Sequence, residues 1–280
     1  MNQNPTFKVL SSMREHGVRC LLMGGQACVF YGAAEFSRDV DFAILASPAN
    51  FRRLQLALDH LQAHVIAIPS FKEAHLHKGL AVHFRCQAPG VEGLRIDVMT
   101  KMRGVDPFPA LWERRTTLEI DHIEVDLMSL PDLVCAKKTQ RAKDWPMIQR
   151  LIEAHWFNHR HEPTAQRIEF WLMECRTPEI LVRLADTHQK EAEHLQTTRP
   201  VLTAALDQDL NALGEHLEKE RLAEVEADRG YWQPLRRALE QIEQKSVENG
   251  EGANSTQYGM SLRSFSSLRD SITLRYLLFE

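Results

Sequence analysis

No stretch of this 280-residue sequence stays apolar over the roughly 18 residues that a membrane-spanning helix needs. The first ten residues, MNQNPTFKVL, also lack an apolar segment of the kind that directs secretion. These two absences predict a cytoplasmic protein that does not enter a membrane.

Cysteine is scarce and scattered, with no C-x-x-C pair in the sequence. The five cysteines are Cys20, Cys28, Cys86, Cys135 and Cys175. An odd and dispersed set favours buried thiols in a reducing compartment over a disulfide framework.

Neither sign of charge is in large excess. The 34 lysines and arginines against 38 acidic residues give a net charge of −4, which excludes a surface that is basic all over. Local basic clusters such as Arg52-Arg53 and Arg114-Arg115 still leave an RNA partner open. Hydrophobic residues make up 44% of the chain, enough to bury a sizeable core.

Several catalytic and metal-binding motifs are missing as well. The sequence contains no G-x-S-x-G and no H-E-x-x-H, and no cysteine lies at a zinc-finger spacing from a histidine. The two histidine groups are His75, His77 and His83, and His155, His159 and His161. We therefore expect these histidines on the surface or in loops.

The first half of the chain alternates helical and strand-like patterns. The predicted helices cover residues 7–16 and 26–31 and a segment that Ser47 caps and Pro48 begins. The predicted strands are 18–23, 40–46, 80–85 and 94–99, with a hairpin at 116–120 and 123–127.

The second half is typical of helices. The predicted helical segments are 132–138, 145–155, 164–175, 178–196 and 201–229, with a continuation to 244 beyond a break near Pro234. These patterns predict an α+β domain at 1–128, an all-helical C-terminal domain at 129–244, and a linker and tail at 245–280.

Three features of the first half indicate a site that binds phosphate and a divalent cation. Gly24-Gly25 lies between a predicted strand and a helix, where the backbone and free N–H groups can approach a phosphate. Asp39 and Asp41, two residues apart on a strand, point to the same face, and a divalent cation such as Mg²⁺ relieves their repulsion. Asp97 interrupts another apolar strand and completes a three-carboxylate cluster if that strand pairs beside the first.

In this order and spacing, Met23-Gly24-Gly25, Asp39-Val40-Asp41 and Asp97 resemble the hydrophobic-G-G/S … D-x-D … D signature of the polymerase β-like nucleotidyltransferase superfamily. The stretch GGQACVFYGAAEFSRDVDFAIL is similar to the minimal bacterial members, which include AbiEii-type toxins and antibiotic-modifying nucleotidyltransferases. The residues that match their pattern are Gly24, Gly25, Ala27, Tyr31, Gly32, Ser37, Asp39 and Asp41. With KKTQRAKDWPMI at 137–148, the resemblance covers residues 5–155.

The resemblance implies a nucleotidyltransferase-type mixed sheet with flanking helices, two Mg²⁺ ions in the active complex, and transfer of a nucleoside monophosphate from a nucleoside triphosphate to a hydroxyl. Asp39, Asp41 and Asp97 are then the catalytic and metal-binding residues, and Asp97 is also expected to accept the hydroxyl proton. The residues expected to bind the nucleotide are Gly24, Gly25, Ser37, Arg38, Lys137 and Arg141.

Two of these assignments carry alternatives. On a helix, Lys137 and Arg141 would share one face and could neutralise phosphate, or could instead form a solvated face paired with Asp144. Many relatives carry an arginine at the position of Glu35, and the adjacent Arg38 would point away if the chain there is extended. Lys137, Lys138, Arg141 or Lys143 would then meet the triphosphate charge, or nucleotide binding would be weaker.

The acceptor stays open among tRNA, a protein hydroxyl and a small molecule. A toxin partnered by an antitoxin is one specific form of the hypothesis. The competing hypotheses are a non-catalytic nucleotide-binding module that retains the fold and a phosphohydrolase that uses the same carboxylates.

Overall fold

The computed structural model describes residues 4–120 and 123–248. The chain divides into two compact units, Met1–Leu235 and Arg236–Glu280, and all candidate site residues lie in the first unit. The domain bounds expected at 128 and 244 stay predictions, and most of the expected tail lies outside the described residues. No helix in the described ranges has both the length and the apolar character needed to cross a membrane.

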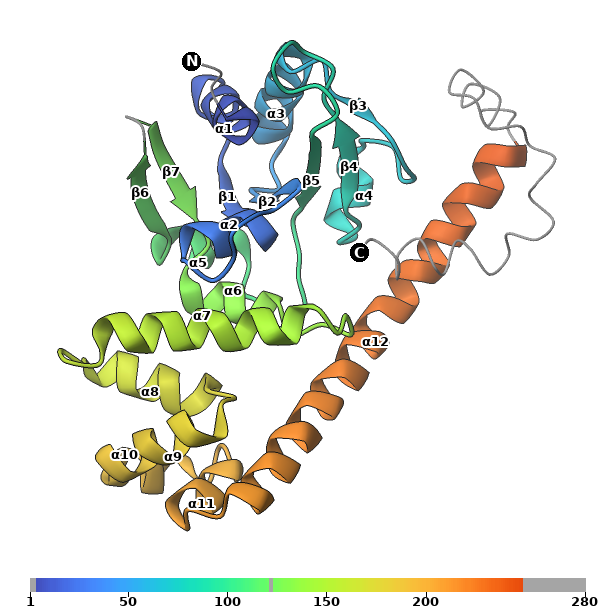
Figure 1. The fold of residues 1–280 in the computed structure, drawn as a ribbon. Coiled ribbons are helices and arrows are strands. Elements are labelled where there is room, and N and C mark those ends of the chain that lie inside the picture. The colour runs from blue at the N-terminus through green and yellow to red at the C-terminus, as the bar shows by residue number, and fades with distance from the viewer. Residues whose placement is uncertain (1–3, 121–122, 249–280) are drawn as a thin grey trace. The chain divides into compact units, whose positions relative to one another are not determined.

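The described strands form one seven-stranded sheet with the order β3-β4-β5-β2-β1-β7-β6 (Figure 1). Their bounds are β1 Cys20–Met23, β2 Asp39–Ile44, β3 His64–Val65, β4 Val82–Arg85, β5 Arg95–Met99, β6 Thr116–Ile120 and β7 Ile123–Leu127. The β2–β5 and β1–β7 pairs are parallel, whereas the other four pairs are antiparallel. The expected α+β class with a mixed sheet is therefore confirmed.

The three central strands, β5, β2 and β1, are apolar along most of their length. Leu21, Leu22, Phe42 and Ile96 are almost wholly buried. Strands that bury both faces read as nearly continuous hydrophobic runs. The aspartates in β2 and β5 are the exceptions to this pattern, and they define the candidate site below.

Five helices accompany the strands of the first half. Their bounds are α1 Pro5–Glu15, α2 Gly24–Phe30, α3 Pro48–His60, α4 Glu73–His77 and α5 Phe108–Glu113. The expected cap of α3 is confirmed, because Ser47 Oγ accepts the Asn50 N–H at 3.3 Å. Figure 1 shows α1 beside α3, where Ser12 Oγ donates to the Ala57 carbonyl at 3.2 Å. The short elements β3, α4 and α5 were not predicted from the sequence.

From Leu130 onward the described residues form only helices. Their bounds are α6 Leu130–Ala136, α7 Asp144–His159, α8 Ala165–Glu174, α9 Pro178–Thr187, α10 Gln189–Leu195, α11 Val201–Leu206 and α12 Leu210–Glu248. Their largest fully buried side chain is Trp171, on α8. The expected helical C-terminal region is thus confirmed.

Three helix boundaries differ from the predictions. The helix expected at 178–196 is two helices separated at His188, whose φ of −123° and ψ of 52° are not helical. The helix expected at 201–229 is interrupted because Asp209 Oδ1 accepts the Ala212 N–H at 3.0 Å and starts α12 anew. The break expected near Pro234 is wrong, since α12 runs through it. Gly230 and Pro234 are both exposed, so water can reach the carbonyl that the proline leaves unpaired.

The thiols are less uniformly buried than expected. All five cysteines are free, and Cys28, Cys86 and Cys175 are buried, but Cys20 and Cys135 are only partly so.

Candidate functional site

Two neighbouring parallel strands bring the three predicted aspartates onto one face of the sheet. Asp39 and Asp41 lie two residues apart on β2, and side chains at that spacing point to the same face. The parallel pairing with β5 places Asp41 opposite Asp97 and Asp39 opposite Arg95. The strand pairing on which the carboxylate hypothesis depends is therefore present.

The glycine turn lies directly against this face. Gly24 follows β1 with a φ of +65°, and a Cβ atom there would lie 1.9 Å from Asp41 Oδ2 and 2.8 Å from Asp41 Cβ. A Cβ on Gly25 would lie 2.6 Å from Ser37 Oγ, which donates to the Asp39 carbonyl at 3.1 Å. The predicted residues Gly24, Gly25 and Ser37 are thus in the same place as the Asp39–Asp41 pair, and the first glycine is required there sterically.

Asp97 is held by two cationic or polar neighbours. Arg95 donates from Nε to Asp97 Oδ1 and from Nη2 to Oδ2, both at 2.8 Å. His83, which β4 places opposite Asp97, brings Nδ1 to 2.8 Å from Oδ1. Asp97 is 6% exposed. Burial acts to raise its pKa, but the contacts with His83 and Arg95 outweigh burial and hold the pKa below its ordinary value.

Neither of these neighbours was predicted from the sequence. Arg95 could have been found, because a residue two positions before Asp97 on a strand shares its face. His83 could not, because its position beside Asp97 depends on the register of β4 against β5. The expectation that His83 is a surface or loop histidine is therefore wrong.

The other two carboxylates are not occupied in this way. Within the described ranges, Asp39 and Asp41 accept no side-chain hydrogen bond and form no ion pair. Burial raises the pKa of Asp39, although the charge of Arg95 acts to lower it. Burial, and after it the charge of Asp97, raise the pKa of Asp41 to about 6. The β2 pair is thus an energetically unfavourable arrangement of two carboxylates, of the kind that a bound cation relieves.

The three carboxylates do not form a ready ligand set. Among the residues that the structure describes, no three His, Cys, Asp or Glu side chains are arranged so as to hold a metal ion. Both oxygens of Asp97 contact Arg95 or His83. The magnesium site on Asp39, Asp41 and Asp97 stays a prediction.

Lys137 and Arg141 converge on Asp144, but not along a helix. Helix α6 ends at Ala136, so both cations belong to the α6–α7 connection, and their predicted i,i+4 placement is wrong. Lys137 Nζ lies 3.2 Å from Asp144 Oδ1, and Arg141 Nε donates to Oδ2 at 2.8 Å. Thr139 Oγ1 also donates to Asp144, which lies in the first turn of α7. Three side chains of the α6–α7 connection therefore contact this one carboxylate.

These cations also act on the carboxylate face. Burial raises the pKa of Asp41, and the charges of Lys137 and Arg141 act in the opposite direction. Lys137 is almost wholly buried, whereas the Arg141 side chain is 46% exposed. The structure therefore places both predicted cations within electrostatic reach of Asp41.

In the segment before β2, Arg38 is the cation that was expected to bind the nucleotide. Glu35 and Arg38 are both exposed, and none of the hydrogen bonds or ion pairs of the described residues joins Arg38 to the carboxylates. The role predicted for Arg38 in nucleotide binding is not tested by these contacts and stays a prediction.

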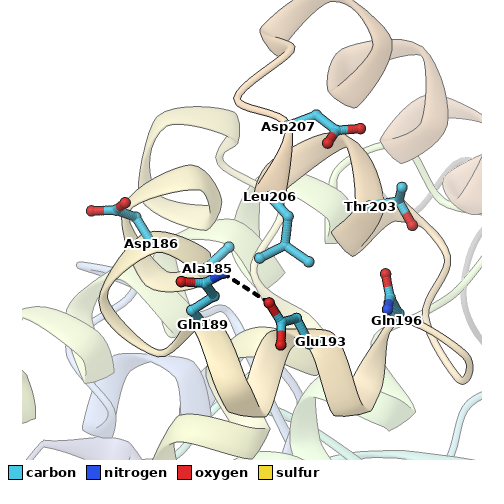
Figure 2. A pocket seen from close by; sticks show the side chains of 8 residues that line it. All are labelled: Ala185, Asp186, Gln189, Glu193, Gln196, Thr203, Leu206 and Asp207. Carbon is cyan, nitrogen blue, oxygen red and sulfur yellow. Dashed lines mark hydrogen bonds between the residues drawn. The ribbon is translucent and has the colours of Figure 1, made fainter.

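One cavity lies elsewhere, among α9, α10 and α11. It measures about 540 Å³, and Figure 2 shows the side chains that line it. They are Ala185, Asp186, Gln189, Glu193, Gln196, Thr203, Leu206 and Asp207. The lining carries three carboxylates and no cation, so it is unsuited to a triphosphate. A second cavity of about 330 Å³, beside His155 and Phe170, also contains no predicted site residue.

The chain is similar to solved structures but to no family model or curated protein. A solved structure, described as an antigenic nucleotidyltransferase-like protein from Paracoccidioides brasiliensis, aligns with 73% of this chain and 92% of its own at 17% identity and a TM-score of 0.37. The fold class given above rests on the strand order and registers, not on this likeness.

Proposed function

We propose that this protein is an Mg²⁺-dependent nucleotidyltransferase that transfers a nucleoside monophosphate from a nucleoside triphosphate to a hydroxyl group. One observation carries the proposal. The β2–β5 register places Asp41 beside Asp97 while Gly24, without a side chain, lies against the Asp41 carboxylate. This is the juxtaposition that the sequence resemblance requires.

The donor set suits a hard divalent cation. Asp39 and Asp41 offer carboxylate oxygens on one face with no competing partner in the described part of the chain, and Asp97 is their cross-strand neighbour. Asp39 and Asp41 would hold the ions together with Asp97 once it is released from Arg95. When bound, Mg²⁺ would neutralise the triphosphate and polarise the reacting phosphorus centre.

The reaction balances with the residues present. The acceptor oxygen forms a bond to the α-phosphorus, the bond to the bridging oxygen of the β-phosphate breaks, and pyrophosphate leaves. Asp97 would take the hydroxyl proton, for which it must exchange its contacts with Arg95 and His83, because these hold its pKa low. Gly25 and Ser37 would contact phosphate oxygens, and Lys137 and Arg141 would balance phosphate charge.

Arg95 strengthens the electrostatic case. The chain has Glu35 where many relatives of this type carry an arginine. Arg95 brings a guanidinium to the carboxylate face at the position opposite Asp39. A group released from Asp97 at this position would be available to the phosphates, in addition to the cations of the α6–α7 connection.

The non-catalytic binding module is the second candidate, and one observation favours it. Both oxygens of Asp97 are engaged by Arg95 and His83. If this engagement persists with nucleotide bound, the third carboxylate cannot act on a metal or on a proton.

Calorimetry with each nucleoside triphosphate, with and without Mg²⁺, tests whether the protein binds nucleotide, which both candidates require. Catalysis is then tested by incubating cell extract with each α-labelled nucleotide and following which class of molecule is labelled. Asp39→Asn should reduce labelling by roughly 100-fold or more, since it removes a metal ligand. The exposed Asp207→Asn should have no effect.

The outcomes are distinct. Labelled acceptor with released pyrophosphate supports the transferase. Nucleotide binding without labelling supports the non-catalytic module, and inorganic phosphate without a labelled acceptor supports a phosphohydrolase. Absence of nucleotide binding under all conditions would refute all three.

A toxin role is a narrower form of the proposal. In that case, expression of the protein alone should slow bacterial growth, and Asp39→Ala should relieve the effect at equal protein abundance. Growth inhibition that persists with Asp39→Ala would separate any toxicity from nucleotidyl transfer.

A further inference from the structure

The segment that carries Lys137 and Arg141 is fastened by side chains from distant parts of the chain. Asp228, on α12, accepts the backbone N–H of Gln140 at 2.9 Å. Trp145 Nε1 donates to the Thr139 carbonyl at 2.9 Å. The backbone of a connection between helices thus has its polar groups satisfied by α12 and α7.

Arg103 is a second fastening point, and it comes from the loop after β5. Its Nη2 donates both to the Lys138 carbonyl and to Glu224 Oε2, the latter at 2.7 Å. Its Nε lies 3.5 Å from Asp228 Oδ1. Arg103 therefore links the loop that follows the Asp97 strand, the cation-bearing segment and α12.

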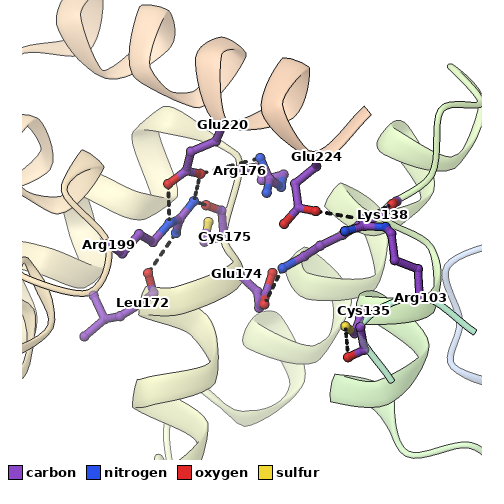
Figure 3. Close-up of polar contacts among 11 residues, drawn as sticks. Arg103, Cys135, Lys138, Leu172, Glu174, Cys175, Arg176, Arg199, Glu220 and Glu224 are labelled. Atoms are coloured by element: carbon purple, nitrogen blue, oxygen red, sulfur yellow. Dashed lines mark hydrogen bonds and ion pairs between the residues drawn. The ribbon is translucent and has the colours of Figure 1, made fainter. Parts of the chain in front are cut away.

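These contacts belong to a larger cluster of charges, most of which Figure 3 shows. It contains four cations, Arg103, Lys138, Arg176 and Arg199, and four carboxylates, Glu174, Glu220, Glu224 and Asp228. Its charge is balanced, so it does not suit an anion or a cation from solution. Its members instead join α8, α12 and the α6–α7 connection.

Asp228 is the most buried carboxylate of the four. Its side chain is 3% exposed, against 19% for Glu174, 27% for Glu220 and 30% for Glu224. A buried carboxylate is costly unless its partners are well placed. Its partners are the Gln140 N–H, the Arg103 guanidinium and the side chain of Trp232 on the same helix, and the first two belong to the arrangement that fixes residues 138–140.

We propose that Asp228 and Arg103 are positioning residues, which hold the segment 137–141 so that Lys137 and Arg141 face the carboxylate site. The inference rests on the proposed function, because it assigns these two cations to the triphosphate. Neither positioning residue needs to touch the nucleotide. Loss of Asp228 frees the Gln140 N–H and leaves Arg103 without a buried counter-charge, so the segment and its cations lose their fixed place.

Three variants test the proposal in the full chain. Asp228→Ala removes the contacts with Gln140, Arg103 and Trp232, whereas Asp228→Asn keeps an oxygen that can accept the Gln140 N–H. Glu226→Ala is the matched control, since Glu226 is an exposed carboxylate on the same helix that pairs only with Arg229 in the described ranges. The measurements are calorimetric affinity for Mg²⁺-ATP, affinity for Mn²⁺ alone, and hydrogen exchange of the peptide that spans 137–145.

We expect Asp228→Ala to weaken Mg²⁺-ATP binding by roughly tenfold. Its affinity for Mn²⁺ alone should not change, because the carboxylate face is intact. Exchange of the 137–145 peptide should accelerate with Asp228→Ala and recover in part with Asp228→Asn. Glu226→Ala should match the wild type in all three measurements.

Two results would overturn the inference and leave the proposed function standing. One is unchanged Mg²⁺-ATP affinity in Asp228→Ala. The other is an equal loss of Mn²⁺ and nucleotide binding, which would show a general loss of structure. If the wild type binds no nucleotide, the proposed function fails, while the exchange measurement still decides whether Asp228 fastens the segment.

Discussion

Gly24 and Gly17 have nearly the same backbone conformation and opposite surroundings. Their φ angles are +65° and +64°, but a Cβ on Gly17 would meet no atom within 4 Å, whereas one on Gly24 would overlap the Asp41 side chain. The cost of a left-handed conformation is therefore common to both positions, and the displacement of Asp41 belongs to Gly24 alone.

We predict that Gly17→Ala lowers the free energy of unfolding by about 1 kcal/mol and leaves Mn²⁺ and nucleotide binding unchanged. Gly24→Ala should cost more stability and should also abolish metal binding. Chemical denaturation and Mn²⁺ titration measure the two effects. Metal binding by Gly24→Ala at wild-type affinity would contradict the placement of Asp41 in the site.

Asp41 should make the folded state less stable at neutral pH than at acid pH. Its pKa is raised to about 6 by burial and by Asp97, while in the unfolded chain it has an ordinary value near 4. Between these values the folded state binds the proton more tightly, so stability falls as the pH rises from about 4 to 6 and stays reduced above that.

Asp41→Asn is therefore expected to raise the free energy of unfolding at pH 7.5 by on the order of 1 kcal/mol. The gain should be largely lost near pH 4, where the folded state carries a neutral side chain and the unfolded state is about half protonated. Asp207→Asn serves as the exposed control and should show no difference at either pH. Denaturant unfolding at the two pH values is the measurement, and a gain that is equal at both would refute the shift.

At the scale of single residues, the sequence predicted what depends on local spacing. Asp39 and Asp41 at i and i+2, and the glycines between a strand and a helix, follow from the period of a strand and the conformational freedom of glycine. The engagement of Asp97 by His83 did not follow from spacing, because it requires the β4–β5 register. The pairing of Lys137 and Arg141 with Asp144 was one of the two alternatives, but their placement on one helical face was wrong, because α6 ends at Ala136.

At the scale of elements, α7 and α8 are joined by a hydrogen bond that depends on a neutral histidine. Trp171 Nε1 donates to His155 Nδ1 at 2.9 Å, so this nitrogen cannot carry a proton while the bond exists. Burial, and then the nearby His159, lower the pKa of His155 to about 4, against about 6.5 in an unfolded chain. The unfolded state therefore takes up the proton first as the pH falls.

The contribution of His155 to stability should be complete above about pH 6.5 and should be lost as the pH falls toward 4. His155→Asn keeps an acceptor for Trp171 and removes the titration, so its stability should fall less over this range than that of the wild type. Exposed His216→Asn should behave like the wild type. Thermal unfolding at pH 7 and pH 4.5 compares the three proteins, and identical pH profiles would refute the role of His155.

Element prediction succeeded where periodicity and a cap agreed and failed where a single contact decided a boundary. The Ser47 cap followed by Pro48 marked α3 correctly. The divided helices around His188 and Asp209 are helical in composition on both sides, so a periodic pattern runs through the break. The two-residue strand β3 is too short to show any period.

At the scale of the whole molecule, the residues after Leu235 matter little to the core. Residues 236–246 and Glu248 are all exposed or only partly buried. The last core residue along α12 is Val225, and all candidate site residues lie before Leu235. The first unit thus contains its own core.

A chain that ends at Leu235 should unfold within about 3 °C of the full-length protein and keep its affinity for Mg²⁺-ATP. A chain that ends at Gly214 loses Leu217, Val225 and Asp228, and should unfold at a clearly lower temperature. Differential scanning calorimetry on the three chains makes the comparison. Loss of cooperative unfolding in the chain that ends at Leu235 would contradict an independent core in the first unit.

The parallel register of β2 and β5 has a consequence for how this site can change. Because side chains alternate through the sheet, inserting one residue between Asp39 and Asp41 would carry one of them to the opposite side. The turn at 86–94, by contrast, could lengthen without changing the face of the sheet to which each aspartate points. Natural or engineered diversity should therefore accumulate in the connections, and the segments of β2 and β5 that carry Asp39, Asp41 and Asp97 should accept neither insertion nor deletion.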